Sequence, residues 1–235
     1  MKISIIIPCY NELKTIGVVV QKVMVAALPG NIEREVVIVD DGSNDGSSEI
    51  IKNISSKHPN VKVFFHSINS GKGAALITGL REASGDIIII QDADLEYNPE
   101  EYTKLTLPII NGVADVVFGS RFISADARRV LFFWHYLGNK FITLITNMFS
   151  NLNLSDIEVG YKVFRKDIIK KVTLREKGFG IEPEIVLKTA RLNCRIYEVG
   201  ISYTGRTYEE GKKIHWTDAI RAMLVILKYG LFRLK

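Results

Sequence analysis

Short apolar runs alternate with longer amphipathic segments through the first half of the chain. The β-branched runs at residues 3–7, 35–39, 61–65 and 87–90 predict buried strands, and helical patterns follow them at residues 15–27, 47–56, 73–83 and 99–110. A further strand is predicted at residues 116–119. This alternation indicates βαβ units with right-handed crossovers, and therefore an α/β fold with a mostly parallel central sheet and flanking helices.

A different pattern follows residue 120. Residues 130–154 form an apolar helical segment, a mixed stretch includes residues 160–165, and then a helix at 184–192, a strand at 195–203 and a final amphipathic helix from 216 are predicted. We therefore divide the chain into an α/β half at residues 1–125, a second half at 126–215 and a basic C-terminal helix at 216–235. With 235 residues, 47% of them hydrophobic, the chain can bury the core of one large domain.

The strand predicted at residues 87–90 ends in a group of acidic residues. Asp92 and Asp94 follow it at alternate positions, and Glu96 comes two residues later. Ligands of open α/β sheets gather at the carboxyl ends of strands, and alternate residues of a strand share a face. Carboxylates placed there suit a hard divalent cation, Mg²⁺ or Mn²⁺, shared with a diphosphate. A solvated acidic turn is the simpler interpretation of the same residues.

Two other predicted strand ends carry groups suited to a nucleoside. Pro8, Tyr10 and Glu12 follow the first strand, while Val39 and Asp41 lie at the end of the second. Proline restricts a turn, the tyrosine ring offers a stacking surface, and carboxylates accept hydrogen bonds from a base or a ribose. The acidic, glycine-containing run at residues 40–47 also predicts a turn and a helix N-cap, and the two roles are compatible.

Several common sites are excluded by spacing. Residues 71–76 lack the third glycine of a dinucleotide-binding fingerprint, and no strand-linked P-loop motif occurs, so the glycines at 71 and 73 are expected to start a helix beside the ligand. The chain has no zinc-ligand cluster and no nucleophile elbow. Cys9 and Cys194 have no ligand spacing, which favours free thiols in a reducing compartment.

The positive charge of the chain is concentrated near its end. The formal net charge is +5, and residues 204–235 hold seven Lys and Arg against three Asp and Glu. Arg206, Lys212 and Lys213 follow one predicted strand and Arg121 follows another, so they are candidates to bind phosphate oxygens. As an alternative, Lys212 and Lys213 could merely solvate a loop. Nucleic-acid binding is disfavoured, because the basic residues are not interleaved with stacking residues.

Residues 130–154 and the final helix have the makeup of interfacial helices. Trp134, Tyr136 and several phenylalanines give the first segment an aromatic face, and basic residues mark the second. Polar residues interrupt the first segment before it reaches the ~20 apolar residues that a spanning helix needs. We expect both to lie on a membrane surface, with core packing or a dimer surface as the alternative. No signal peptide is evident, which favours a cytoplasmic protein on the cytosolic face.

Taken in order and spacing, these motifs resemble the inverting family-2 glycosyltransferases of GT-A fold, and most closely the dolichyl- and polyprenyl-phosphate mannosyl- and glucosyltransferases. The resemblance runs from Ile3 to about Met223. It is carried by residues 8–12, 39–43, 71–73, 92–96, 119–122 and 206–212. Relatives often carry Gln at the position of Glu96, so the extra carboxylate bears on metal preference.

The resemblance implies a metal-dependent enzyme that moves mannose or glucose from GDP-mannose or UDP-glucose to a polyprenyl or dolichyl phosphate at a membrane surface. A homo-oligomer or a membrane partner protein is compatible with it. By the same resemblance, the catalytic residues are Asp92, Asp94, Arg121 and Arg206; the nucleotide sugar is held by Pro8, Tyr10, Glu12, Val39, Asp41, Ala93 and Lys212; and Mg²⁺ or Mn²⁺ is held by Asp92, Asp94 and Glu96.

The expected acceptor removes the need for a general base. A phosphate monoester has its second pKa near ~6 and is largely dianionic at neutral pH, so positioning and electrostatics suffice for its attack. Three alternatives stay open. A transferase with a hydroxyl acceptor would need a base, for which Asp156, Glu158, Glu182 and Glu184 are candidates; a nucleotidyltransferase shares the Asp-x-Asp chemistry; and a silent membrane adaptor would keep the fold alone.

Overall fold

The computed structural model describes residues 1–123, 129–130, 132–211, 213 and 216–232. The strands are β1 (Lys2–Cys9), β2 (Glu33–Asp40), β3 (Val61–Phe65), β4 (Ile87–Ile90), β5 (Val116–Ser120), β6 (Lys162–Arg165) and β7 (Ile196–Gly200). The helices are α1 (Ile16–Val25), α2 (Ser47–Lys57), α3 (Lys72–Glu82), η1 (Pro99–Glu101), α4 (Tyr102–Ile110), α5 (Phe133–Ser150), α6 (Lys166–Ile169), α7 (Ile181–Ala190) and α8 (Trp216–Leu231).

The strands form one seven-stranded sheet in the order β3-β2-β1-β4-β6-β5-β7. Only β6 runs against its neighbours β4 and β5, so the predicted mostly parallel sheet is confirmed. The sequence analysis left β6 in the mixed stretch at 160–165, because a four-residue apolar run has no period of its own. Two flanking strands complete its hydrogen bonds, which is a tertiary effect.

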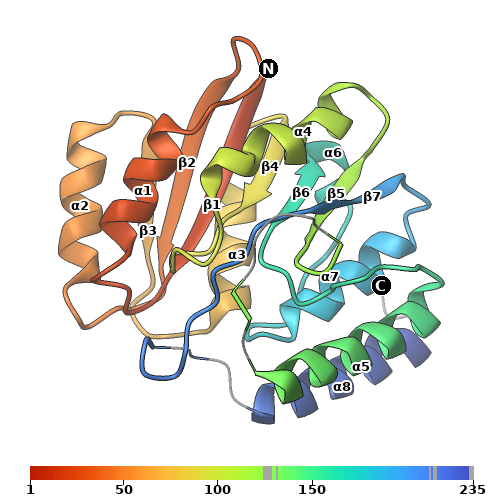
Figure 1. Ribbon diagram of the computed structural model, residues 1–235. Helices are drawn as coiled ribbons and strands as arrows, with labels where there is room; N and C mark the ends of the chain where they lie inside the picture. The colour runs from red at the N-terminus through yellow and green to blue at the C-terminus, as the bar shows by residue number, and fades with distance from the viewer. Residues whose placement is uncertain (124–128, 131, 212, 214–215, 233–235) are drawn as a thin grey trace.

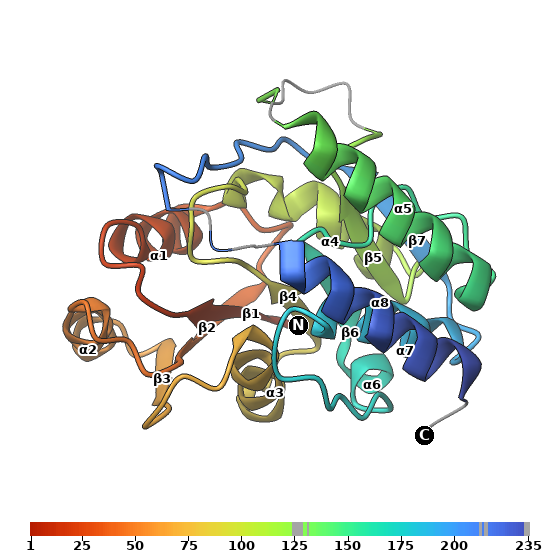
Figure 2. The ribbon, with the colours of Figure 1, turned by 90° about the horizontal axis from the view of Figure 1, so that it is seen from below.

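Helices cover both faces of the sheet, as Figures 1 and 2 show. On β1, Ile5 and Ile7 belong to the core cluster beneath α1 and α4, whereas Ile6 belongs to the cluster beneath α3 and α7. The alternation follows from the two-residue period of a strand. Because both faces are covered, these strands read as unbroken aliphatic runs.

The predicted helices and strands are confirmed with shifted ends. The helix expected at 184–192 begins three residues earlier at Ile181, because Pro183 is tolerated in a first turn, where its missing N–H is not needed. The strand expected at 195–203 pairs with β5 only over Ile196–Gly200. The apolar segment at 130–154 forms α5, and the final helix begins at Trp216 as expected.

The topology brings six strand ends to one edge of the sheet, since every strand but β6 points the same way. The register of β1 with β2 places Cys9 level with Asp40, so the residues after both strands lie side by side. The register of β1 with β4 places Ile6 level with Ile90, which brings the acidic residues after β4 beside Pro8. The candidate residues therefore meet at this edge.

Candidate functional site

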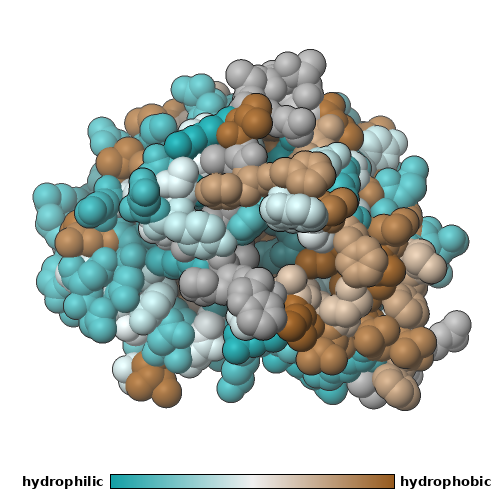
Figure 3. Space-filling view, turned by 60° about the horizontal axis from the view of Figure 1, so that its bottom comes forward, coloured by the Kyte–Doolittle hydropathy of each residue, from teal (hydrophilic) through white to brown (hydrophobic). Residues whose placement is uncertain are grey.

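A cavity of about 900 Å³ lies along this edge. It lies on the side of the molecule turned forward in Figure 3. Its wall includes the following residues predicted from the sequence: Pro8, Tyr10, Glu12, Asp41, Asp92, Ala93, Asp94, Glu96, Arg121 and Arg206. The side chain of Val39 is fully buried in the core instead and does not line the cavity. Lys212 lies outside the described residues.

The side of the cavity formed after β1 and β2 is fixed by Asp41. Its buried carboxylate accepts hydrogen bonds from the backbone N–H groups of Ser70, at 3.1 Å, and Gly71, at 2.7 Å. It also contacts Nδ1 of His66 at 2.6 Å. These bonds hold residues 66–71 against the end of β2. The Asp41 carboxylate thus shapes the wall of the cavity. The partly exposed Tyr10 lines the same cavity.

Asp92, Asp94 and Glu96, here called the carboxylate cluster, each contact a polar or cationic partner. Asp92 pairs with Nζ of Lys72 at 2.8 Å, and Asp94 pairs with Nη2 of Arg206 at 3.1 Å. Glu96 accepts hydrogen bonds from Tyr203 Oη at 2.9 Å and from the backbone N–H of Arg206 at 2.8 Å. No three acidic, histidine or cysteine side chains converge on a single point within the described residues.

The backbone of the carboxylate cluster is strained. Leu95, between two of its members, has a φ of 64°, a left-handed conformation that costs a leucine on the order of 1–3 kcal/mol. Gly160 packs against the cluster from the other side, and a β-carbon there would collide with Oδ2 of Asp92. The surrounding fold therefore holds these carboxylates in a conformation that the local sequence does not favour.

The carboxylate cluster supplies the oxygen donors that a hard divalent cation prefers, although these donors do not converge on one point within the described residues. Burial, together with the charges of Asp92 and Glu96, raises the pKa of Asp94 from its ordinary value of 3.8 to about 7, even though Arg206 acts in the opposite direction. A hard cation placed beside such a carboxyl group adds favourable charge and stabilises its ionised form. The residues present are thus suited to Mg²⁺ or Mn²⁺.

Arg206 and Lys213, which belong to the C-terminal part of the chain, both bind Glu12. Arg206 reaches Glu12 at 3.1 Å, and Lys213 reaches it at 2.8 Å. Lys213 also contacts the backbone carbonyl groups of Tyr10 and Asn11 and lies 5.7 Å from the centre of the Tyr10 ring. Lys213 therefore lines the site and pairs with it, while its side chain stays 39% exposed to solvent.

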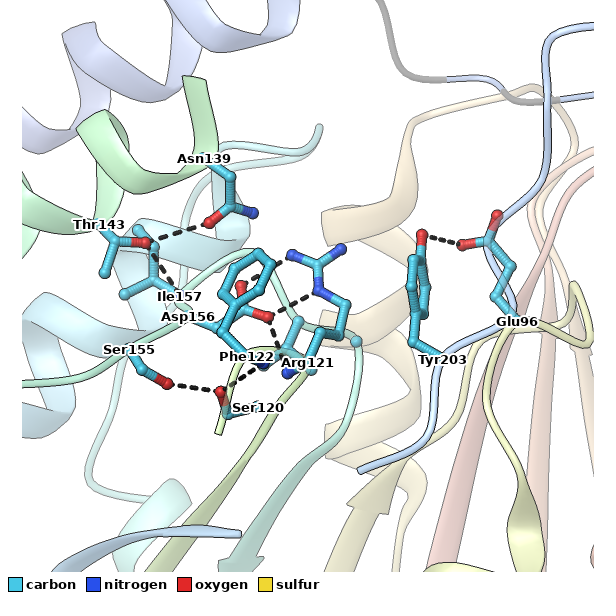
Figure 4. A network of polar contacts seen from close by, with 12 residues as sticks. Glu96, Ser120, Arg121, Phe122, Asn139, Thr143, Ser155, Asp156, Ile157 and Tyr203 are labelled. Carbon is cyan, nitrogen blue, oxygen red and sulfur yellow. Dashed lines mark hydrogen bonds and ion pairs between the residues drawn. The ribbon is translucent and has the colours of Figure 1, made fainter. Parts of the chain in front are cut away.

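Arg121 is held by a buried partner that the sequence analysis assigned a different role. Its Nε and Nη2 donate to Asp156 at 2.6 and 2.7 Å, and Tyr203 lies 5.0 Å from the guanidinium group (Figure 4). Burial opposes the charge of Asp156, but Arg121 outweighs it and lowers the pKa of that carboxyl group. Asp156 is thus an anchor for Arg121, which makes it unsuitable as a base.

A buried ion-pair network contacts the carboxylate cluster through Lys72, which pairs with Asp92. Glu182 binds Lys72 at 2.9 Å and also pairs with the fully buried Lys162. Burial opposes the charge of Lys72, but Asp92 and Glu182 outweigh it and raise its pKa, so the ammonium group stays charged. Lys72 begins α3 as expected. Gly73 has no room for a side chain because the backbone of Glu176 touches it.

Sequence reasoning missed this network. Lys72 belonged to a motif singled out for its glycines, and nothing in the local pattern marked Lys162 as buried. The available signal was a lysine between two glycines at the start of a helix, directly after a strand that ends at the site.

An apolar surface adjoins the cavity. The helices α5 and α8 lie side by side in both ribbon views. Hydrophobic side chains recur at helical spacing on their outer faces and form a patch in Figure 3. The exposed members, here called the apolar face, include Phe133, Trp134, Leu137, Phe141, Leu144 and Met148 on α5, and Ile220, Leu224, Leu227 and Leu231 on α8. Within the described residues, no helix is long and apolar enough to cross a membrane.

Comparison with known proteins matches the chain to one family. A sequence model described as Glycosyl transferase family 2 covers residues 4–173. The chain is 30% identical over 224 residues to an undecaprenyl-phosphate mannosyltransferase from Micrococcus luteus, with 90% of this chain and 87% of that protein covered. It is 34% identical over 220 residues to a dolichol-phosphate mannosyltransferase from Pyrococcus furiosus, covering 91% of this chain and 61% of that protein.

A third relative carries a different sugar in its name. It is a UDP-N-acetylglucosamine–dolichyl-phosphate N-acetylglucosaminyltransferase from Methanococcus voltae, 30% identical over 247 residues, with 97% of this chain and 96% of that protein covered. Among solved structures, glucosyl-3-phosphoglycerate synthase from Mycobacterium tuberculosis with Mn²⁺ and UDP-glucose superimposes with a TM-score of 0.74 at 19% identity, covering 97% of this chain and 78% of that one. This similarity confirms the predicted α/β fold of GT-A type.

Proposed function

The chain belongs to glycosyl transferase family 2 and is a glycosyltransferase; on that premise we propose that it transfers a hexose from a nucleotide diphosphate sugar to a polyprenyl or dolichyl phosphate, with inversion. The observation that carries the proposal is one cavity that joins the carboxylate cluster, the mostly buried Arg121 and the apolar face. The carboxylate cluster would hold the metal for the donor diphosphate, the arginine would bind the acceptor phosphate, and the apolar face would contact the lipid. The relatives' names support the lipid phosphate.

The donor is proposed to lie along the strand ends. Tyr10 and the wall held by Asp41 would take the nucleoside, and the diphosphate would lie at the carboxylate cluster. A divalent cation held by the cluster would neutralise the charge that develops on the leaving diphosphate. The transferred sugar is proposed to be mannose or glucose.

The acceptor phosphate is proposed to bind Arg121, with Arg206 and Lys212 as further cations. Asp156 fixes the guanidinium group of Arg121 in one plane, so an oxyanion can approach a preoriented positive group. A dianionic phosphate monoester carries its own nucleophilic oxygen and needs no base. The chain's contribution to the reaction is then to position two charged substrates and to balance their charge.

The carboxylates considered as bases for a hydroxyl acceptor are mostly engaged. Asp156 holds Arg121 and Glu182 holds two lysines. Glu184 accepts hydrogen bonds from the backbone of Arg175, at 3.0 Å, and pairs with a lysine at 2.8 Å. Glu158 has no such partner among the described residues, and it is the remaining candidate for the hydroxyl-acceptor alternative.

The apolar face is proposed to rest on the cytosolic surface of a membrane. Its aromatic and aliphatic side chains would enter the interface, and the exposed Arg221 and Lys228 of α8 would meet anionic head groups. The cavity wall includes Trp134 from the start of this face. A lipid phosphate could then reach Arg121 while its chain stays in the bilayer.

The test incubates the purified protein with Mg²⁺ or Mn²⁺, polyprenyl phosphate and a panel of nucleotide sugars. Released nucleoside diphosphate and lipid-linked sugar are measured by mass. We expect a polyprenyl-phosphate-linked sugar to form from one of the nucleotide sugars, and we expect Asp94→Ala to form none of it. Transfer to a hydroxyl acceptor alone would refute the lipid-phosphate acceptor, and release of pyrophosphate would identify a nucleotidyltransferase.

A further inference from the structure

One carboxyl group on the cavity wall differs from its neighbours. Each of the other carboxylates there contacts a cation or a hydrogen-bond donor; they are Glu12, Asp41, Asp92, Asp94, Glu96, Glu182 and Asp218. Glu158 contacts no donor among the described residues, and its Oε1 is buried without a hydrogen-bond partner. Such an atom is costly to keep buried, which points to a partner that binds from the cavity.

Glu158 lies between the two charged parts of the site. Two residues before it, Asp156 holds Arg121, and two residues after it, Gly160 packs directly against Asp92. In a nucleotide sugar the hexose follows the diphosphate. If the nucleoside lies at the ends of β1 and β2 and the diphosphate at the carboxylate cluster, as proposed above, the hexose would occupy the part of the cavity that Glu158 borders.

We propose that Glu158 binds a hydroxyl group of the transferred hexose and thereby contributes to the choice of donor. Within the described residues its Oε1 has no hydrogen-bond partner, so rotation about the last side-chain bond could present a carboxyl oxygen to the cavity that the residue lines. Burial and the charge of Glu182 raise the pKa of Glu158 to about 7. Around neutral pH it can therefore both accept and donate a hydrogen bond. The inference rests on the donor half of the proposed function.

The test compares bare and sugar-bearing nucleotides on the whole protein. Titration calorimetry in the presence of Mn²⁺ measures the Kd of UDP, GDP, UDP-glucose, UDP-N-acetylglucosamine and GDP-mannose. We expect E158A to weaken binding of the preferred nucleotide sugar about tenfold, as the loss of one hydrogen bond, and to leave the nucleoside diphosphate unchanged. The affinity of E158A for the other nucleotide sugars should change less, so the difference in Kd between the preferred donor and the others should become smaller. E158Q keeps a donor and an acceptor and should stay within about threefold.

Two controls separate a binding role from a structural one. Glu198 supports the same loop, because its Oε1 accepts from the backbone N–H of Ser155 at 2.8 Å, but it does not line the cavity. E198Q should leave every Kd unchanged. Since Glu158 makes no hydrogen bond to the part of the chain that the structure describes, neither E158A nor E158Q should lower the Tm.

Three results would overturn the assignment of Glu158. These are an E158A protein with unchanged affinity for every nucleotide sugar, an equal loss of affinity for the bare diphosphate, or an E158Q protein that binds donor normally but loses turnover. The last result would identify a proton acceptor and would favour a hydroxyl acceptor. If the unaltered protein binds a donor but transfers nothing to polyprenyl phosphate, the acceptor proposal fails while that for Glu158 stands.

Discussion

Replacing Asp156 by Asn tests whether the buried ion pair with Arg121 holds the site together. The substitution preserves side-chain volume, removes the negative charge and leaves the Arg121 guanidinium, whose side chain is only 13% exposed, facing a neutral amide. Removing one partner of a buried pair costs about 3–5 kcal/mol, because the other charge stays buried and unpaired. For a chain of this size the Tm should fall on the order of 10 °C.

The chain provides a matched control for this variant. Arg165 binds Asp167 in the same bidentate way, at 3.0 and 2.7 Å, but both side chains are exposed, at 41% and 53%. Water already solvates and screens that pair, so Asp167→Asn should cost less than about 1 kcal/mol. The two pairs share a bidentate geometry and differ in burial, and Arg165 also keeps a second carboxylate partner, Asp115, at 2.8 Å, which lowers the expected cost further.

The functional consequence is measured at a temperature where both variants are folded. A guanidinium group displaced by about 1 Å can lower a rate on the order of 100-fold, so kcat/KM for polyprenyl phosphate should fall that far in Asp156→Asn and stay near the original value in Asp167→Asn. Equal Tm losses in the two variants would refute the reasoning on burial. An unchanged kcat/KM in Asp156→Asn would refute the role of Arg121 in binding the acceptor.

Three further outcomes are expected. Gly160→Ala should abolish donor-dependent turnover, because its β-carbon collides with the carboxylate cluster, whereas Gly178→Ala, with open space around it, should retain turnover; equal activities would contradict this packing. The pKa of Asp94, raised from 3.8 to about 7, means that the folded protein binds a proton in this range that the unfolded chain releases. The free energy of unfolding without metal should therefore fall as pH rises from about 4 to 7, and Mn²⁺ should bind more tightly as pH rises through 7. Thermal unfolding of the original protein and of Asp94→Asn, with and without Mn²⁺, measures both trends. If the pH dependence persists in Asp94→Asn, Asp94 is not the group responsible. Leu224→Asp should weaken sedimentation with anionic liposomes about tenfold or more, whereas Leu107→Asp on α4 should not; equal losses would show that the apolar face is not the contact.

Much of the fold could be predicted from the sequence because its determinants are local. Aliphatic runs such as Ile87–Ile90 have one stable environment, a strand buried on both faces, and the helices between them carry a 3.6-residue period. Strand β6 could not be found this way, because Lys162–Arg165 is a strand only between β4 and β5. Its hydrogen bonds come from residues far away in the chain.

Part of the candidate site was equally accessible. In a parallel sheet the carboxyl ends of strands meet at one edge, so polar residues after Cys9, Asp40 and Ile90 had to come together whatever the details of the loops. The sequence therefore sufficed to bring Tyr10 and Asp92 to the same cavity. The side chain of Val39, which the same reasoning included, lies in the core, because alternation along β2 turns it away.

The charge pairing was decided by tertiary structure alone. Asp156 and Arg121 are 35 residues apart, and Lys72 meets Glu182 only because α3 and α7 begin at the same edge of the sheet. Sequence spacing carries no information about such pairs, since burial and the position of the partner determine whether a carboxylate is an anchor, a metal ligand or, like Glu158 among the described residues, a group without a hydrogen-bond partner. The sequence by itself determined most of the architecture and part of the lining of the cavity. The assembled fold decided what each of those residues touches, because charge and burial depend on neighbours that only folding brings together.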